Sequence, residues 1–210
     1  APVPKPSHRV AASGVDGRYD VEDQLARGGM ALVYRARDKV TGRMVALKWL
    51  DMYGAAEQQL RRHIDLFERE YHILQQLSHP RVVQCYEYGV HDGNPFYTME
   101  LLDGGDLRDL APLPWQDVCR IAYDVCSALS LLHSRQLVHL DVSPRNVRRT
   151  ADGTAKLIDF GLLAPMGVCA LAAGTPAFMA PEVLCNVTVD GRADLFSLGA
   201  TLYYVLTGRA

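Results

Sequence analysis

The pattern of apolar and polar residues from Tyr19 to Leu50 is that of β-strands. The pattern is interrupted at Gly28-Gly29 and again at Thr41-Gly42. The second interruption is typical of a hairpin turn, and it predicts two neighbouring strands over residues 31–37 and 44–50.

A helical pattern follows the hairpin. Apolar residues recur at steps of four and three, which predicts one amphipathic helix that ends at His79-Pro80. The residues of this stripe are Leu60, Ile64, Phe67, Tyr71 and Leu74. Two more strands are predicted over residues 82–88 and 95–101, on either side of the turn signal Asp92-Gly93. The first half is therefore expected to be a small antiparallel sheet with one helix.

The pattern becomes mainly helical after Gly104-Gly105. A second long amphipathic helix is predicted from the stripe Trp115, Val118, Ile121, Val125, Leu129 and Leu132. The longest apolar stretch, residues 195–206, is too short to span a bilayer and predicts a buried core helix. We expect a flexible linker or tail over residues 1–14 and two lobes over residues 15–102 and 103–210.

Composition narrows the classes of partner. Hydrophobic residues make up 49% of the chain, which is enough for a sizeable core. Lys and Arg number 22 against 24 Asp and Glu, so charge favours neither nucleic acid nor an anionic membrane as a partner. The five cysteines form no Cys-x-x-Cys pair, and no signal peptide is visible. Reduced thiols in a cytoplasmic protein are the expectation.

Two charged residues in the first half suit a phosphate site. Strand alternation places Ala46 and Lys48 on one face and Val45 and Leu47 on the other. A small residue beside a lysine on a strand that lines a cleft can contact a flat base and its phosphates, although a surface lysine on an edge strand fits the same pattern. Glu70 on the predicted helix can hold the Lys48 ammonium by an ion pair, or it can lie on a solvated helix face.

The most specific segment runs from His139 to Asn146 and reads His-Leu-Asp-Val-Ser-Pro-Arg-Asn. An aspartate such as Asp141 can accept the proton of an attacking hydroxyl, and an asparagine a few residues later can bind Mg²⁺. Asp159-Phe160-Gly161 offers a second metal carboxylate. The two aspartates lie 18 residues apart with a turn at Asp152-Gly153 between them, so two ordinary strand-end turns are a poor explanation.

These segments, with Val45-Ala46-Leu47-Lys48 before them and Ala180-Pro181-Glu182 after them, stand in the order of the protein-kinase signature set. The chain resembles a eukaryotic-type protein kinase and is most similar to the bacterial serine/threonine kinases. The resemblance covers roughly residues 19–209. It implies an α+β, bilobal protein-kinase-like fold, with a small antiparallel-sheet N-lobe that carries one helix and a mainly helical C-lobe.

The resemblance implies a catalytic role for several residues. Lys48 would contact the α- and β-phosphates of ATP and pair with Glu70, although Glu68 on the same helix is a competitor. Asp141 would be the catalytic base, and Thr175 would contact it near the acceptor hydroxyl. Two residues would hold Mg²⁺, Asn146 and Asp159.

An ATP site is also implied. Met99 would be the gatekeeper, and the backbones of Glu100 and Leu102 would meet the adenine edge. Asp194 would anchor the central helix beneath the catalytic loop. The full set of expected ATP-binding positions is Ala26, Gly28, Gly29, Val33, Ala46, Lys48, Met99, Glu100, Leu102 and Arg148. A stacked hydrophobic spine would contain His139, Phe160, Leu74 and Cys85.

The glycine-rich loop departs from the family pattern. The family has G-x-G-x-x-G-x-V, and here Ala26 and Ala31 stand where two of the three glycines are expected. Alanine tolerates most of a hairpin but not a positive φ. Gly28 and Gly29 can still bring backbone N–H groups near phosphate. We therefore expect weaker ATP affinity without its loss.

A second departure concerns regulation. Leu140 replaces the arginine that, in the family, grips a phosphorylated activation loop. Between Gly161 and Gly174 the chain has no Ser, Thr or Tyr. The two absences agree, and the hypothesis is that phosphorylation of this loop does not switch the protein.

A third departure lies in the catalytic loop. Ser143 replaces a lysine that neutralises the γ-phosphate in serine/threonine kinases, and Arg145 stands two residues later, where tyrosine kinases place an arginine. Arg145 can supply the missing charge or can be a solvated member of a basic cluster. Arg148 replaces the apolar residue under adenine, where its guanidinium could stack on the base or clash with it.

The expected function is a protein serine/threonine kinase that transfers the γ-phosphoryl group of ATP, with Mg²⁺, to a protein Ser or Thr hydroxyl. A catalytically impaired pseudokinase scaffold that binds nucleotide or partner proteins is the alternative. A small-molecule phosphotransferase fits less well, because Gly174-Thr175-Pro176 and Ala180-Pro181-Glu182 are typical of a polypeptide-substrate platform. The end at Ala210 predicts an incomplete, truncated C-lobe that is poorly soluble or poorly active alone, with further domains in the full-length protein.

Overall fold

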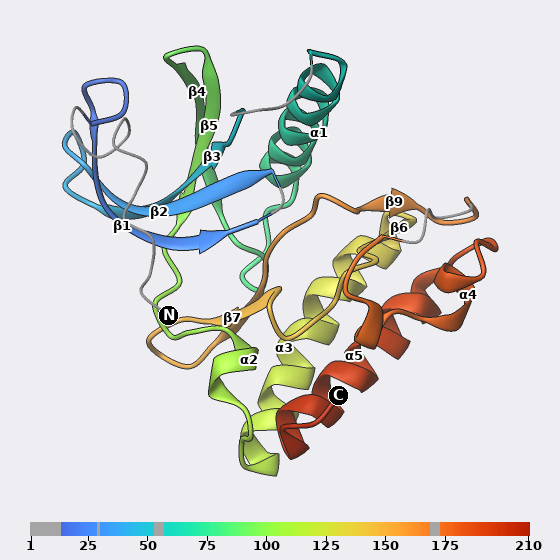
Figure 1. Cartoon of the computed structure of the whole chain (residues 1–210). Helices are drawn as coiled ribbons and strands as arrows, with labels where there is room; N and C mark the ends of the chain where they lie inside the picture. Colours follow the sequence, from blue (N-terminus) through green and yellow to red (C-terminus); the bar gives the residue numbers. More distant parts are fainter. Residues whose placement is uncertain (1–13, 29, 53–56, 169–172) are drawn as a thin grey trace. The chain divides into compact units, whose positions relative to one another are not determined.

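The computed structural model describes residues 14–28, 30–52, 57–168 and 173–210 (Figure 1). The chain divides into two compact units. The first unit contains Ala1–Gln76 and Gln84–Leu101, and the second contains Leu77–Val83 and Leu102–Ala210. The expected division at residues 102 and 103 assigned Leu77–Val83 to the first unit, whereas this segment belongs to the second.

The first unit is an antiparallel sheet with one helix, α1 (Glu57–Gln76). Its strands are β1 (Tyr19–Arg27), β2 (Ala31–Asp38), β3 (Met44–Leu50), β4 (Cys85–His91) and β5 (Asn94–Glu100). The strand order is β1-β2-β3-β5-β4, and every pair is antiparallel. The hairpin predicted around Thr41-Gly42 is present as β2 and β3.

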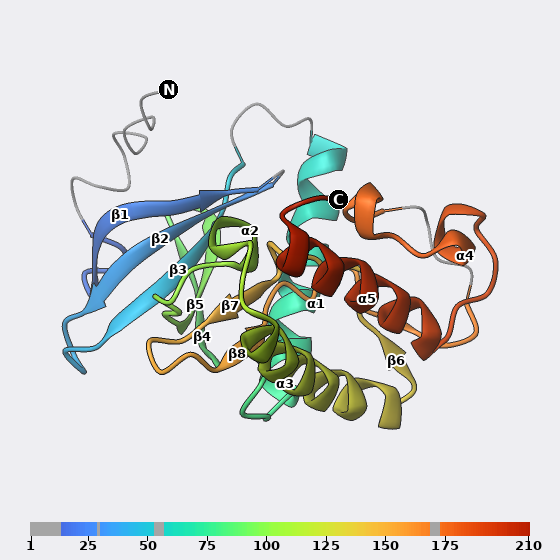
Figure 2. The same ribbon diagram turned by 90° about the horizontal axis from the view of Figure 1, so that it is seen from below.

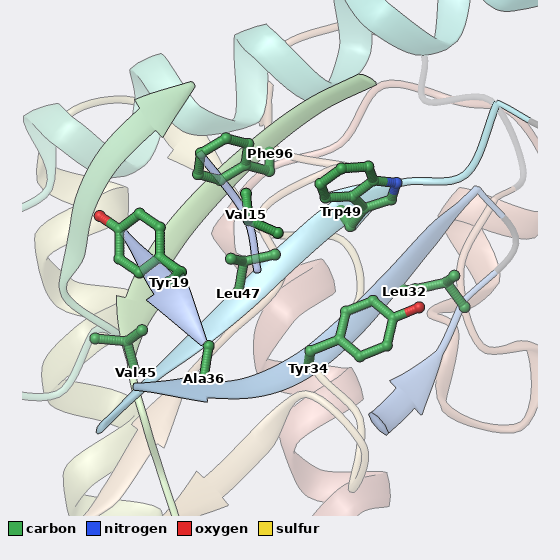
Figure 3. Close-up of a cluster of buried hydrophobic side chains, with 9 residues drawn as sticks. All are labelled: Val15, Tyr19, Leu32, Tyr34, Ala36, Val45, Leu47, Trp49 and Phe96. Carbon is green, nitrogen blue, oxygen red and sulfur yellow. The ribbon is translucent and has the colours of Figure 1, made fainter. Parts of the chain in front are cut away.

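One face of this sheet carries an apolar core, shown in Figure 3. Val45, Leu47 and Trp49 alternate along β3 and join this core, as strand periodicity requires. The rings of Trp49 and Phe96 stack with centroids 6.1 Å apart. Val15, which precedes the first strand, is fully buried in the same cluster, so residues from 15 onward belong to the folded unit.

The opposite face packs against α1. Phe67 is buried on this helix, and its ring lies 5.0 Å from that of Tyr97 on β5. Leu74 is buried two stripe positions further along, and the predicted helical stripe therefore marks the inward face correctly.

The start of β4 differs from the prediction. The strand begins at Cys85, and Val82 and Val83 belong to the second unit. The Val83 N–H donates to the carbonyl of Leu157 at 3.0 Å, and Val82 forms a parallel bridge with the same residue. The strand was predicted to start at residue 82 because Val82 and Val83 are apolar, and both are indeed buried. Their backbone partner is Leu157 of the second unit, so they are not part of β4.

The second unit is mainly helical, and α3 lies beside α5 in both views (Figures 1 and 2). Its helices are α2 (Leu107–Leu110), α3 (Trp115–Ser134), η1 (Pro176–Phe178), α4 (Pro181–Leu184) and α5 (Gly191–Thr207). Its short strands are β6 (Leu137–Val138), β7 (Val147–Arg149), β8 (Ala155–Leu157) and β9 (Ala164–Pro165). β6 pairs with β9, and β7 pairs with β8. The α+β class, with its sheet part followed by a helical part, is confirmed.

Two apolar expectations in this unit were too strong. Trp115 begins α3 but is 65% exposed, so the buried stripe starts at Val118. The helix α5 buries only one side, on which the residues Ala193, Asp194, Ser197, Leu198, Thr201 and Val205 lie. Leu195 and Phe196 point outward and are about half exposed. Mean apolarity predicted full burial, whereas the buried side is formed largely by small and polar residues.

None of the helices among the described residues has the length and apolarity needed to cross a membrane.

Candidate active site

Lys48 and Glu70 meet in the first unit. The Lys48 ammonium lies 2.8 Å from each carboxylate oxygen of Glu70, and the two side chains are 14% and 6% exposed. Strand β3 and helix α1 therefore place opposite charges together where water screens them little. The competitor Glu68 accepts instead from the Tyr88 hydroxyl at 2.8 Å.

The expected ATP-binding side chains of the first unit fall on the sheet face that also bears Lys48. In the strand register Ala26 pairs with Val33, and Val33 pairs with Lys48. Ala46 pairs with Met99 on β5. Residues directly opposite one another in a sheet share a face. These side chains therefore lie on the face opposite the apolar core. Glu100 ends β5, paired with Val45.

The glycine-rich turn contains a hydrogen bond of its own. The Gly28 N–H donates to the Ala31 carbonyl at 2.8 Å. The turn therefore already uses this N–H, which corrects the expectation that it points toward phosphate. Gly29 lies outside the described residues.

In the second unit, Asp141 lies at the centre of a hydrogen-bond network. Its Oδ1 accepts from the backbone N–H of Thr175 at 2.9 Å and from the Thr175 hydroxyl at 2.8 Å. Its Oδ2 accepts from the side-chain amide of Asn146 at 2.6 Å, and the Asp141 carbonyl accepts from the same amide at 2.9 Å. Both carboxylate oxygens are thus fixed in direction by neighbours from two separate segments.

Asp194 fixes the backbone immediately before Asp141. Its carboxylate is fully buried and accepts from the N–H groups of His139 and Leu140, both at 2.9 Å. A buried carboxylate needs such donors, since leaving it unpaired would cost several kcal/mol, roughly 3–5 by analogy with broken buried ion pairs. The backbone of His139 and Leu140 is therefore tied to the N-terminal part of α5.

His133 is a further member of this arrangement, and no sequence motif indicates it. Its Nε2 lies 2.9 Å from Asp194 Oδ2, so the carboxylate has a partner on α3 as well. His133 occupies the last turn of α3, and no local pattern separates it from an ordinary helix-terminal histidine.

The ring of His139 packs edge-on against Phe160, with centroids 4.9 Å apart. Burial lowers the pKa of His139 below its ordinary value, against the opposing effects of Asp194, Asp141 and Asp159. The neutral imidazole accepts the Asp141 N–H at Nδ1, at 3.2 Å. Leu74 and Cys85, the other expected members of a spine, belong to the first unit.

Asp159 follows β8 in a left-handed backbone conformation, with φ of 61°. The Ile158 N–H donates to the Asn146 carbonyl at 2.9 Å, which brings the segment of Asp159 beside that of Asn146. The Asn146 amide nitrogen is committed to Asp141, so its side-chain oxygen remains as the group that could bind a cation. Amide and carboxylate oxygens are the donors that Mg²⁺ prefers, and these two residues fit it in type.

The substituted positions of the catalytic loop have distinct environments. Ser143 is fully buried, and its hydroxyl finds no hydrogen-bond partner among the described residues. Arg145 is exposed. Arg148 lies half-buried in β7, paired with Lys156 and bridged through its backbone to Asp106. Leu102 is buried at the start of the second unit's main segment.

A model of the protein kinase domain matches residues 19–210, nearly all of the folded chain. The chain belongs to the protein kinase family. The resemblance to bacterial serine/threonine kinases is confirmed as well, since the similar proteins described next carry that name.

Three relatives illustrate the similarity. The serine/threonine-protein kinase PknL of Mycobacterium tuberculosis (strain ATCC 25618 / H37Rv) is 36% identical over 203 residues, which cover 92% of this chain and 50% of the relative. The DNA damage-responsive serine/threonine-protein kinase RqkA of Deinococcus radiodurans is 39% identical, over 91% of this chain and 30% of the relative. The serine/threonine-protein kinase PknB of Mycobacterium leprae is 35% identical, over 91% and 32%. The chain thus spans half the length of these kinases or less.

Proposed function

We propose that this chain is the catalytic part of an active serine/threonine protein kinase, which transfers the γ-phosphoryl group of ATP to a Ser or Thr hydroxyl of a protein. The observation that carries the proposal is the fixed carboxylate of Asp141. Thr175 and Asn146 hold its two oxygens from two different segments, and a general base needs such a fixed direction.

In the proposed reaction, the acceptor hydroxyl oxygen forms a bond to the γ-phosphorus of ATP. The bond between that phosphorus and the oxygen bridging to the β-phosphate breaks, and ADP leaves. The hydroxyl proton passes to the Asp141 carboxylate. Thr175 donates to the same Oδ1 and keeps the carboxylate oriented as the acceptor approaches.

Lys48 would bind the α- and β-phosphates, with Glu70 fixing the direction of its ammonium. Asn146 and Asp159 would hold Mg²⁺, which supplies charge neutralisation on the phosphates when bound. The exposed Arg145 would supply positive charge near the transferred group, because Ser143 is buried and uncharged.

The test compares the full-length protein with its Asp141→Asn variant, using ATP, Mg²⁺ and a generic protein that offers Ser and Thr hydroxyls. We expect phosphoserine or phosphothreonine from the parent and a loss of about 10²–10⁴-fold in the variant. Asp117→Asn is the matched control, because Asp117 lies in the first turn of α3 and its side chain is 29% exposed. This control should keep the parent's activity.

Absence of transfer by the parent, with ATP binding intact, would overturn the proposal in favour of a nucleotide-binding pseudokinase. Transfer that survives in Asp141→Asn would remove Asp141 from the role of base. The altered glycine-rich turn makes the binding measurement necessary, since its N–H at Gly28 is already paired.

A further inference from the structure

Leu140 stands between His139 and Asp141 in a left-handed backbone conformation, with φ of 68°. Such a φ is uncommon for a residue with a side chain, and it persists when the surroundings determine it. Here the Leu140 N–H donates to Asp194 Oδ1 at 2.9 Å. The direction of the side chain is therefore set by a fully buried carboxylate, and only 7% of the residue is exposed.

The Leu140 side chain lies in an apolar cluster that joins three parts of the second unit. We call it the Leu140 cluster. Its buried members are Val138, Leu140, Met179, Ala180, Val183, Val189 and Ala193. Three partly buried residues pack against them, Leu162, Ala164 and Met166. Every member is apolar.

The three packed residues come from the segment that follows Asp159-Phe160-Gly161. They lie in and on either side of the short strand β9, and all three pack against the cluster. Leu140 thus contributes, from the catalytic loop, to the apolar surface that this segment covers.

Backbone hydrogen bonds hold the same segment on both sides. Ala164 pairs with Val138 in the β6–β9 ladder, and the Met166 N–H donates to the Gln136 carbonyl at 2.9 Å. On the other side the Gly167 N–H donates to the Val189 carbonyl at 2.8 Å. Residues 162–168 are therefore ordered by backbone pairing and apolar burial together.

Phosphate has no part in this order. Residues 162–173 contain no hydroxyl side chain that could be phosphorylated, and position 140 carries no charge that could bind a phosphate. Apolar burial is favourable without any covalent modification. The cluster thus holds the segment by apolar contacts alone.

We propose that Leu140 is a positioning residue, which holds residues 162–168 against the catalytic loop by apolar packing and so makes the segment's order independent of phosphorylation. The proposal deepens the proposed kinase function and rests on it for its consequence in catalysis. The structural part of the proposal does not depend on turnover, and the experiments separate the two.

Hydrogen exchange tests the structural part in the full-length protein after phosphatase treatment. In the parent, backbone amides within residues 162–168 should be protected without phosphate. Leu140→Ala removes buried methyl groups and should raise exchange in this segment by about tenfold or more. Leu140→Met keeps volume and apolarity, and it should remain within about twofold of the parent.

Leu129→Ala is the matched control, because Leu129 is buried in α3 of the same unit but does not belong to the Leu140 cluster. It should lower the stability of the unit without selectively raising exchange in residues 162–168. If Leu140→Ala fails to fold, Met166→Ala serves in its place, since Met166 lies at the edge of the cluster and is only partly buried. Exchange in this segment that is equally fast in the cluster variant and in Leu129→Ala would overturn the proposal.

Kinetics test the consequence for catalysis. Phosphatase treatment should change the parent's kcat by less than about twofold, and Leu140→Ala should lower kcat about tenfold with little change in KM for ATP. Leu140→Met should restore kcat. A kcat that requires phosphate, or a Leu140→Ala defect confined to KM, would overturn the positioning role. A parent without activity would instead refute the proposed function, while the exchange results would still decide whether the cluster orders the segment.

Discussion

In the first unit Lys48 meets Glu70 through a single ion pair between a strand and a helix. In the second unit Asp141 is held by three donors from Asn146 and Thr175, and Asp194 fixes the backbone before it. The first arrangement joins one strand to one helix, so it depends on where that helix lies. The second is a network in which each segment supports another.

The two arrangements therefore differ in the kind of change that would disrupt them. Displacing α1 would separate Lys48 from Glu70 while leaving the sheet intact, since the apolar core lies on the opposite face. Breaking the network at Asp194 would release two backbone N–H groups in the buried interior at once. We therefore expect changes in the first unit to affect activity, and changes at the base of the second to affect folding as well.

The largest expected effect is that of Asp194→Ala. The change leaves the N–H groups of His139 and Leu140 without their acceptor and removes the partner of His133. The free energy of unfolding of the second unit should fall by about 3–5 kcal/mol, the usual cost of breaking a buried charged arrangement. Urea denaturation of the full-length protein, followed by hydrogen exchange in α5, measures this loss.

Asp190→Ala is the control for that experiment. Asp190 caps the same helix through the Arg192 N–H but is 45% exposed, so its loss should cost only about 1 kcal/mol. Equal losses in the two variants would mean that Asp194 acts as an ordinary helix residue and that the network is not the basis of stability.

The next effect in size is that of Glu70→Ala, which tests the single ion pair. Without Glu70 the Lys48 ammonium loses the contact that directs it, and kcat/KM should fall by roughly a hundredfold, the scale of a small misplacement of a binding group. Steady-state kinetics with ATP and a protein substrate measure the change. Glu68→Ala, two residues earlier on α1, removes only the contact to Tyr88 and should change kcat/KM little. A larger defect in Glu68→Ala would reverse the assignment.

The two units also differ in how far the sequence could predict them. Period-two and period-3.6 patterns depend on local burial, and they located Lys48 on its sheet face and Phe67 on the inner side of α1. These patterns could not predict that Val82 and Val83 belong to the second unit. Apolar residues in the sequence indicate burial, but they do not indicate which backbone segment the residues pair with.

In the candidate site, the motifs named pairs of residues that lie in contact, such as Asp141 with Thr175. They did not name His133, whose position depends on how α3 packs on α5, or the pairing of the Gly28 N–H inside its own turn. Motif spacing gives residue identity along the chain, whereas these two features depend on distances between segments and on the direction of a single N–H.

The third prediction concerns the charge near the transferred phosphate. Arg145 is exposed in the catalytic loop, whereas Arg148 lies half-buried in β7. Arg145→Ala should lower kcat about tenfold, somewhat less than the loss seen when a fixed donor to a transition-state charge is removed. Arg148→Ala is the matched variant and should cost far less in kcat. Equal losses, or none in Arg145→Ala, would refute a special role for Arg145.

The smallest expected effect lies outside the site, in the first unit. Arg18 donates two hydrogen bonds of 2.8 Å to Asp38, and these hold the pKa of the Asp38 carboxyl well below its ordinary value of 3.8. A carboxyl with a lowered pKa in the folded state stabilises the fold above its ordinary pKa, and this contribution is lost as pH falls through the folded-state value. The first unit should therefore lose stability progressively below about pH 4.

Asp38→Asn isolates this contribution. The variant should be less stable than the parent by about 1 kcal/mol at pH 7. The difference should shrink toward pH 3, because the Asp38 carboxyl then takes up a proton in the unfolded parent but not yet in the folded parent. Urea denaturation at the two pH values measures both differences. Asp20→Asn is the control, because its pair with Lys39 is 3.3 Å long between side chains that are 56% and 45% exposed, and such pairs contribute little. A difference between Asp38→Asn and the parent that grows as the pH falls would contradict the sign of the pKa shift. The ion pair between Arg18 and Asp38 would then not be a source of stability for the first unit.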